Sequence, residues 1–341
     1  ALWNRDNTLP LGKLDKNSIA VATIGSPGDG IFAVTCRRYA DVDTYTTTGA
    51  IAAPTLAEIL QHDAVVAVVY SDNAAARNAW GQLTDAKSLT GVFMMNPYKM
   101  NKFKGALDKA EALLLCYDNI PEMRSAAAQA VFGGITVQGT LPVNIAPTAK
   151  AGAGVVIPKS RLGYTSPAAE GLSSSLTDSI DSIVGYAIAT GAFPGCQVLV
   201  ARGGNVVLEK AYGKLTAGGA PVTPYTLYDL ASVSKATGTL PGVMKAYDLG
   251  LFSLDDAAAR HIPGLQGTGK EDITVRQLLY HESGMPASLN MFNVMIDTAS
   301  YSGKLITPRR DAQHTIKIQN GAWGHTSGRV RNDMSAVAAA T

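Results

Sequence analysis

Short apolar runs alternate with helical patterns throughout the first 146 residues of the chain. The runs cover residues 19–25, 64–70, 90–94 and 110–117, and the helical patterns cover residues 55–62, 73–86, 101–107 and 121–132. A continuous apolar run suits a strand buried on both faces, and strands that alternate with helices form parallel sheets. We therefore predict a doubly wound, mostly parallel α/β sheet over residues 17–146.

The composition indicates a compact, folded chain and argues against several functions. Charged residues make up 16% of the 341 residues, the formal net charge is +2, and no basic run could neutralise a series of phosphates. Nucleic acid is therefore not expected as a partner. The longest apolar runs are far shorter than the roughly 20 residues of a membrane span. The cysteines Cys36, Cys116 and Cys196 have no paired spacing, so we expect buried thiols, with neither a metal site nor a cofactor.

A change of composition divides the chain into two expected domains. Residues 147–175 are rich in Ala, Gly, Pro and Ser and read as a linker, and a new helical pattern begins near Leu176. Two strand-like segments then follow at residues 197–201 and 205–212, joined through Gly203 and Gly204, which is a hairpin signal. The predicted domains are residues 1–146 and 176–341.

Ser232 and Lys235 form the strongest chemical motif. They stand in a Ser-x-x-Lys spacing before a helix-compatible stretch at residues 236–248. Residues three apart share a helix face, so the amine of Lys235 can reach the hydroxyl of Ser232 and activate it as a nucleophile. Amides at the helix N-terminus would offer donors to a developing oxyanion. By itself the spacing is common, and a helix cap beside a solvated lysine is the alternative.

Further segments follow this pair, namely residues 249–256, residues 261–264 (His-Ile-Pro-Gly) and residues 272–286. Together with the hairpin they resemble the serine β-lactamase and penicillin-binding family of the class C type, over about residues 176–290. The resemblance implies a partial α+β domain in which Ser232 is the acylated nucleophile and Lys235 its proton partner. It also implies a structural His-x-Ser-Gly turn at His281, Ser283 and Gly284, with His281 as a packing residue rather than a base.

Two later elements of that family are not found at their usual distances. Tyr301-Ser302-Gly303 comes too early, and lacks the Asn, for the Tyr-x-Asn triplet, and His325-Thr326-Ser327-Gly328 comes too early for the Lys/His-Thr-Gly strand. The chain also starts without Met and stops within an Ala-rich helical pattern. We therefore expect a fragment whose second domain is truncated, with apolar patches exposed at both ends.

The first domain carries a second resemblance. Asn7 to Leu11, Phe93 to Tyr98, Tyr117 to Asn119, and the segment from Phe132-Gly133-Gly134 to Gly139-Thr140-Leu141-Pro142-Val143 resemble the C-terminal α/β sandwich of glycoside hydrolase family 3. This resemblance implies a β-N-acetylglucosaminidase-like protein whose catalytic residues belong to a barrel outside this chain, so no glycosidase residue is assigned here.

Other polar features of the first domain are given structural roles. Asp72, Asp118 and Glu122 lie near predicted strand ends, where a cap or a solvated surface is the favoured interpretation. The glycine-rich residues 25–30 lack the spacing of a phosphate loop and predict a tight turn.

The two resemblances together predict a bacterial cell-envelope or periplasmic hydrolase that acts on peptidoglycan or related amino-sugar substrates. The missing barrel and the missing half-domain are its expected partners. The acyl substrate stays open, since lactamases, peptidases and esterases share the acyl-serine step. The competing hypothesis is a catalytically inert scaffold or binding fragment.

Overall fold

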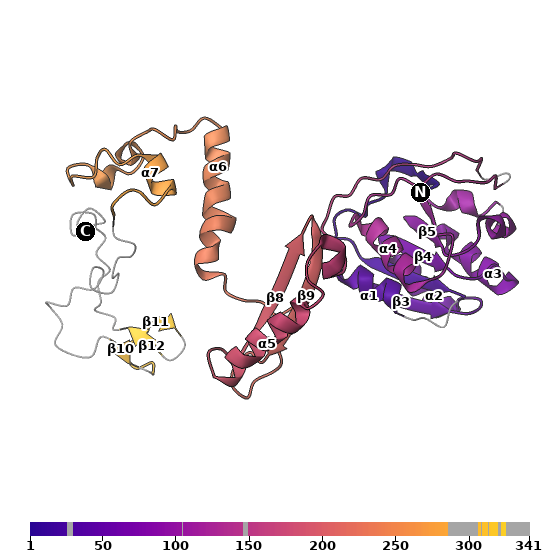
Figure 1. Cartoon of the computed structure of the whole chain (residues 1–341), viewed down its shortest axis with the longest axis horizontal. Coiled ribbons are helices and arrows are strands. Elements are labelled where there is room, and N and C mark those ends of the chain that lie inside the picture. Colours follow the sequence, from indigo (N-terminus) through magenta and orange to yellow (C-terminus); the bar gives the residue numbers. More distant parts are fainter. Residues whose placement is uncertain are drawn as a thin grey trace. The chain divides into compact units, whose positions relative to one another are not determined.

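The computed structural model describes residues 1–25, 30–103, 105–145 and 149–285, and then residues 306–307, 309–312, 314–319 and 322–324. The chain divides into two compact units, residues 1–226 and residues 227–341 (Figure 1). The division falls after the hairpin, whereas the change in sequence composition falls near residue 147.

A six-stranded sheet forms the centre of the first unit, in the order β1-β6-β5-β4-β2-β3. Strand β2 pairs in parallel with both β3 and β4, and β5 pairs in parallel with both β4 and β6. Strand β1 pairs antiparallel with β6. The strands are β1 (Trp3–Asn4), β2 (Ile19–Ile24), β3 (Asp43–Thr47), β4 (Ala64–Val69), β5 (Leu89–Phe93) and β6 (Ala112–Leu115). The predicted mostly parallel α/β sheet is therefore confirmed.

The sequence interpretation missed the two edge strands, β1 and β3. Strand β1 has two residues, too few for a pattern, and β3 reads Asp-Thr-Tyr-Thr-Thr with no buried residue. An edge strand is paired along one side only and needs no apolar run. The hydrophobic pattern of the sequence therefore predicts the central strands of the sheet but not the two edge strands.

Helices cover both faces of the sheet, as a doubly wound fold requires. They are α1 (Ile31–Arg37), α2 (Ala53–Gln61), α3 (Ala74–Gln82) and α4 (Pro121–Phe132). The predicted bounds of α4 are confirmed, and α1 was not predicted. The helix expected over residues 101–107 is wrong, because 3₁₀ turns at Pro97–Phe103 and Leu107–Lys109 replace it. Met100, Phe103 and Leu107 have helical spacing and are buried. Gly105, which lies between Phe103 and Leu107, has φ +77°, and a continuous right-handed helix cannot include this conformation.

Two hydrophobic clusters lie on opposite faces of the sheet. Strand β4 shows the division, since Val65, Ala67 and Val69 join one cluster while Val66 and Val68 join the other. Successive side chains of a strand point to opposite faces, so β4 is buried on both sides. Helices α2 and α3 contribute to the first cluster and helices α1 and α4 to the second.

Part of the segment expected as a linker packs within the first unit. Ile157 is buried in the cluster of α1 and α4, and its backbone pairs with Val137. Strand β7 (Gly163–Tyr164) then pairs in parallel with β9, which joins the segment to the hairpin. Single residues of the segment make these contacts, so the hydrophobic periodicity of the sequence does not reveal them.

The hairpin after α5 (Leu176–Ala189) agrees with its prediction. Strand β8 (Gly195–Arg202) pairs antiparallel with β9 (Asn205–Gly213). Gly203 and Gly204 make the turn with φ +59° and +79°, a conformation that a two-residue hairpin of this kind needs.

The second unit contains α6 (Leu240–Asp248) and α7 (Val275–Leu279). The short strands β10 (Ile306–Thr307), β11 (Ile316–Gln319) and β12 (Ala322–Gly324) form a separate antiparallel sheet in the order β10-β12-β11. Among the residues described in both units, no helix has the length and apolar character of a membrane span.

Candidate active site

Ser232 and Lys235 lie together in the second unit, as their spacing predicts. The Nζ atom of Lys235 donates a hydrogen bond of 2.9 Å to Oγ of Ser232. Ser232 belongs to a 3₁₀ turn at Ala231–Val233, and Lys235 opens a π-helical turn at Lys235–Thr239 that continues into α6. One continuous helical segment therefore carries both groups on one side.

The backbone immediately before Ser232 adopts a rare conformation. Ala231 has φ +43°, and its amide donates to Oδ1 of Asp229 at 2.8 Å. A positive φ at a residue with a Cβ costs of order 1–3 kcal/mol and occurs preferentially at functional positions. Here it turns the chain into the helical segment at the residue that precedes the candidate nucleophile.

The amides that follow Ser232 are already engaged. The amide of Val233 donates to the carbonyl of Leu230 at 2.9 Å, and the amide of Ser234 donates to the carbonyl of Ala231. These two amides are therefore not free donors for an oxyanion. For the amide of Ser232 itself, the expectation that the start of the helical segment offers such a donor stays a prediction.

Lys235 is an exposed side chain whose hydrogen bond goes to the candidate nucleophile. None of the ion pairs among the described residues includes it. Ser232 is exposed as well. The arrangement can pass a proton between the hydroxyl and the amine, which is the first requirement of nucleophilic catalysis by serine.

The predicted turn after α7 is present, but its histidine is not packed. His281 is exposed, has φ +59°, and its amide donates to the carbonyl of Leu278 at 3.2 Å. Oγ of Ser283 accepts from the amide of Met285 at 3.3 Å. The structural role of the turn stays a prediction, whereas the expectation of a packing histidine is wrong. Tyr301 and the 325–328 motif lie outside the described residues.

Residues 253–261, which span parts of the segments 249–256 and 261–264, contain a polar cluster that sequence reasoning did not identify. Asp256 accepts from the amide of Ser253 at 2.9 Å, and it also contacts His261 at 3.1 Å and Arg260 at 3.2 Å. The Ser253 amide and then His261 lower the pKa of Asp256. The only cue in the sequence was the spacing of these polar residues, which fits a folded turn.

The acidic residues noted in the first domain have structural surroundings. Asp72 forms ion pairs with Lys102 and Lys99, and the hydrogen bond from Lys102 lowers the pKa of Asp72. Oδ1 of Asp118 accepts from the amide of Asn119 at 2.7 Å, and Glu122 is exposed in the first turn of α4. These contacts agree with cap and surface roles.

The three cysteines differ in burial. Burial raises the pKa of the Cys36 thiol well above its ordinary value and raises that of Cys116 to about 12. Cys196 is half-buried, so the expectation of buried thiols is wrong for it. No group of three or more His, Cys, Asp or Glu that could hold a metal occurs within the described part of the chain.

Comparison with known proteins identifies the class of the second half of the chain. Residues 180–311 match the family model described as Beta-lactamase. These residues therefore form part of a domain of the β-lactamase-like serine hydrolases. The match includes most of α5, the hairpin, the Ser232–Lys235 pair and the polar cluster at Asp256.

Two curated relatives share this part of the chain. Protein flp of Staphylococcus aureus (strain NCTC 8325 / PS 47) is 32% identical over 127 residues, which are 35% of this chain and 24% of that protein. A putative D-alanyl-D-alanine carboxypeptidase of Escherichia coli O157:H7 is 28% identical over 155 residues, which are 41% of this chain and 36% of that protein. The chain thus spans well under half the length of either relative.

Two solved structures are similar to part of the chain. A fungal multi-domain GH3 β-N-acetylglucosaminidase with a GCN5-related glucosamine N-acetyltransferase region has a TM-score of 0.38 and 22% identity over 43% of this chain and 18% of that chain. A GH3 exo-β-xylosidase has a TM-score of 0.32 and 19% identity over 42% of this chain and 24% of that chain. TM-scores this low carry no conclusion about fold or activity.

Proposed function

We propose that this protein is an acyl-serine hydrolase in which Ser232 is the nucleophile and Lys235 the proton partner. Oγ of Ser232 attacks the substrate carbonyl while its proton passes to the amine of Lys235. The protonated amine then gives that proton to the leaving group, and water later cleaves the acyl-serine ester. The 2.9 Å contact between the two side chains is the observation on which the proposal rests.

Peptidoglycan peptides are the substrates that we propose for this hydrolase, and the cell envelope or periplasm is the proposed location. One relative is named as a putative D-alanyl-D-alanine carboxypeptidase, and a D-alanyl peptide, a β-lactam and an ester all acylate serine through the same attack on a carbonyl. The activity of the whole protein is part of this proposal, because the chain covers 36% of that relative.

Covalent labelling tests the proposed nucleophile. The protein is incubated with a fluorescent penicillin and, separately, with p-nitrophenyl acetate, and its intact mass is then measured. We expect an adduct of one acyl group per chain that disappears in Ser232→Ala and persists in the matched variant Ser234→Ala. An adduct that survives in Ser232→Ala would overturn the assignment.

For residues 1–146 we propose the C-terminal α/β domain of a family 3 glycosidase of the β-N-acetylglucosaminidase kind, packed in the parent protein against a catalytic barrel. The support is the resemblance of the segment from Phe132 to Val143, in which Gly133 and Gly134 meet strict packing demands. A Cβ on Gly133 would lie 2.9 Å from Pro10, and a Cβ on Gly134 would overlap the hydroxyl of Tyr39. Release of N-acetylglucosamine from muropeptides by the full-length protein tests this proposal, and no turnover would contradict it.

An inert scaffold is the competing proposal, and one observation favours it. Ser232 and Lys235 are both exposed, whereas an acyl-enzyme site normally encloses its substrate. The labelling experiment separates the two proposals. If neither this chain nor the full-length protein forms an adduct, the scaffold is favoured.

A further inference from the structure

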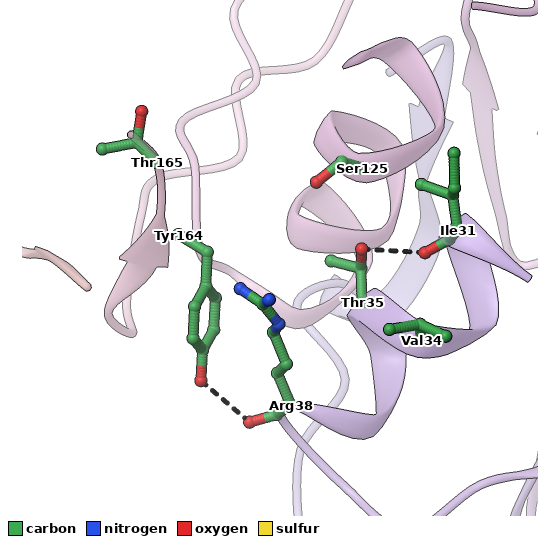
Figure 2. Close-up of a pocket in the computed structure, with 7 residues that line it drawn as sticks. All are labelled: Ile31, Val34, Thr35, Arg38, Ser125, Tyr164 and Thr165. Carbon is green, nitrogen blue, oxygen red and sulfur yellow. Dashed lines mark hydrogen bonds between the residues drawn. The ribbon is translucent and has the colours of Figure 1, made fainter. Parts of the chain in front are cut away.

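A pocket of about 410 Å³ lies in the first unit, between α1, α4 and β7 (Figure 2). Its volume falls within the range of small-molecule sites. Apolar side chains form part of the wall, and one arginine with several hydroxyl-bearing side chains forms the rest. The lining residues are Ile31, Val34, Thr35, Arg38, Ser125, Tyr164 and Thr165.

Tyr164 forms a firmly held wall of this pocket. Its backbone amide donates to Oε1 of Gln129 at 2.7 Å, its carbonyl accepts from Nε2 of Gln129 at 3.0 Å, and Gln129 is buried. The phenol donates to the carbonyl of Arg38 at 3.1 Å. The wall is therefore built by a buried amide side chain and does not depend on surface contacts alone.

Arg38 supplies the charge of the pocket. Its guanidinium lies over the ring of Tyr164 at 4.6 Å, beside the pocket space in Figure 2. Within the described residues none of the ion pairs involves Arg38, and no acidic side chain lines the pocket. The acidic side chain of Glu209 lines a neighbouring hollow together with Arg37 and Arg38. The pocket thus presents a stacked cation without a carboxylate partner.

The hydroxyls add donors on the same space. Ser125 accepts a long hydrogen bond of 3.5 Å from Gln129, which leaves its own proton available. The side chain of Thr165 has no hydrogen-bond partner in the part of the chain that is described, whereas Thr35 already donates to the carbonyl of Ile31 at 2.8 Å. The guanidinium of Arg38 can only donate, and both hydroxyls can donate as well, so the pocket suits a ligand with acceptor oxygens.

We propose that this pocket binds a small organic carboxylate. A planar guanidinium matches a carboxylate through parallel N–H···O bonds, and the hydroxyls of Ser125 and Thr165 can donate to further oxygens. Ile31, Val34 and the ring of Tyr164 contact the carbon body of the ligand, which an inorganic anion lacks. The lining residues belong to the first unit and do not include Ser232, so this proposal does not rest on the proposed hydrolase activity.

Ligand-observed NMR titration tests the proposal with three probes. They are N-acetyl-alanine, its neutral analogue N-acetyl-alaninamide, and inorganic phosphate. We expect saturable binding of N-acetyl-alanine and much weaker binding of the amide and of phosphate. Equal binding of the amide would overturn the requirement for a carboxylate, and equal binding of phosphate would overturn the choice of an organic ligand.

Two adjacent arginines provide a matched pair of variants. Arg38→Gln should weaken the binding of N-acetyl-alanine by about tenfold or more, since it removes a charge-assisted hydrogen-bond pair. Arg37→Gln is the control, because Arg37 donates to Oγ1 of Thr44 at 3.1 Å and does not line the pocket. Ser232→Ala should bind as the unchanged protein does. Equal affinities of the two arginine variants, with both folded by circular dichroism, would refute the site.

Discussion

The hydrogen bond between Lys235 and Ser232 gives each side chain a distinct expected role. Removing the amine leaves the Ser232 hydroxyl in place but without a proton acceptor, and a positioned general base contributes about 10²–10⁴-fold to a rate. We predict that Lys235→Met lowers the rate of acyl-adduct formation with p-nitrophenyl acetate by this factor. The rate is measured from intact masses over time.

Lys245→Met is the matched control for that prediction. Lys245 is an exposed lysine in α6, ten positions further along the same helical segment. Its loss should leave the rate unchanged. An equal fall in both variants would mean that the cationic surface of the segment, and not a specific proton transfer, accounts for the effect.

The strained residue before the nucleophile makes a prediction about stability. Ala231 holds φ +43°, and a left-handed conformation costs a residue with a Cβ roughly 1–2 kcal/mol. Glycine removes this cost but loses some of the gain to the entropy of the unfolded chain. We therefore predict that Ala231→Gly raises the free energy of unfolding by up to about 1 kcal/mol.

Urea unfolding measures this change, and Ala236→Gly provides the opposite case. Ala236 lies within the π-helical turn, where glycine should cost about 1 kcal/mol relative to alanine. A loss of stability in both variants would show that Ala231 is not strained.

At the scale of elements, the end of α4 depends on closely packed glycines. A Cβ on Gly134 would overlap the hydroxyl of Tyr39, which cannot move away easily. Tyr39 stacks on Phe132 with a centroid distance of 5.3 Å and donates to the carbonyl of Leu162 at 3.0 Å. We predict that Gly134→Ala destabilises the first unit by about 1–3 kcal/mol, the usual cost of overpacking.

Gly139 belongs to the same segment, from Phe132 to Val143, and provides the control. A Cβ there would meet nothing within 4 Å, so Gly139→Ala should leave the midpoint of urea unfolding nearly unchanged. If the two substitutions shift the midpoint equally, the packing at Tyr39 is not what requires glycine.

The contact between α5 and β9 depends on one carboxylate. Asp181 accepts from Nζ of Lys210 at 2.7 and 2.8 Å and from the hydroxyl of Tyr212 at 2.6 Å. The bond from Lys210 and then that from Tyr212 lower the pKa of Asp181 from 3.8. Burial, followed by the bond to Asp181, raises the pKa of Tyr212 from 10.0 to about 12.

These shifts define the pH dependence of the contact. A lowered carboxyl pKa stabilises the fold above pH 3.8, and this stabilisation is lost as the pH falls through the lower folded value. The raised pKa of the Tyr212 phenol stabilises the fold below pH 10.0, and this stabilisation is lost as the pH rises towards about 12. We predict that Asp181→Asn is less stable than the unchanged protein at neutral pH and that the difference shrinks at both extremes.

Urea unfolding at a series of pH values checks this prediction. Asp178→Asn is the control, because Asp178 lies exposed in the first turn of the same helix. The stability of this variant should follow that of the unchanged protein closely across the series. A difference for Asp181→Asn that stays constant with pH would contradict the ionic nature of the contact.

Sequence pattern predicted those elements whose stability comes from their own residues. The central strands are continuous apolar runs, α4 begins with Pro121 and ends at Gly133, and the hairpin turn has two glycines. The strand β3 and the packing of Ile157 depend on partners far away in the chain, which periodicity does not report. Likewise the Ser232–Lys235 contact follows from local spacing, whereas the cluster around Asp256 and the pocket at Arg38 need the folded chain.

On the scale of the whole molecule, the two units differ in how much apolar surface they bury. The first unit has a hydrophobic cluster on each face of its sheet. In the described part of the second unit, the buried cluster consists of Ala258, Ala259 and Leu265. Helix α6 has no buried residue, and its Met244 is 59% exposed. Since buried apolar area is the main source of stability, the second unit should open more readily.

Limited proteolysis with a protease of broad specificity measures this difference, because cleavage follows the population of locally opened chain. We predict that the first cuts fall between residues 227 and 285 and that a product close to residues 1–226 resists further digestion. The products are identified by mass. Gly134→Ala should shorten the lifetime of that product, whereas Gly139→Ala should not, since only the first substitution disturbs the packing of the first unit. First cuts within residues 30–103 would contradict the ranking, because β3 to β5 would then be no better protected than α6.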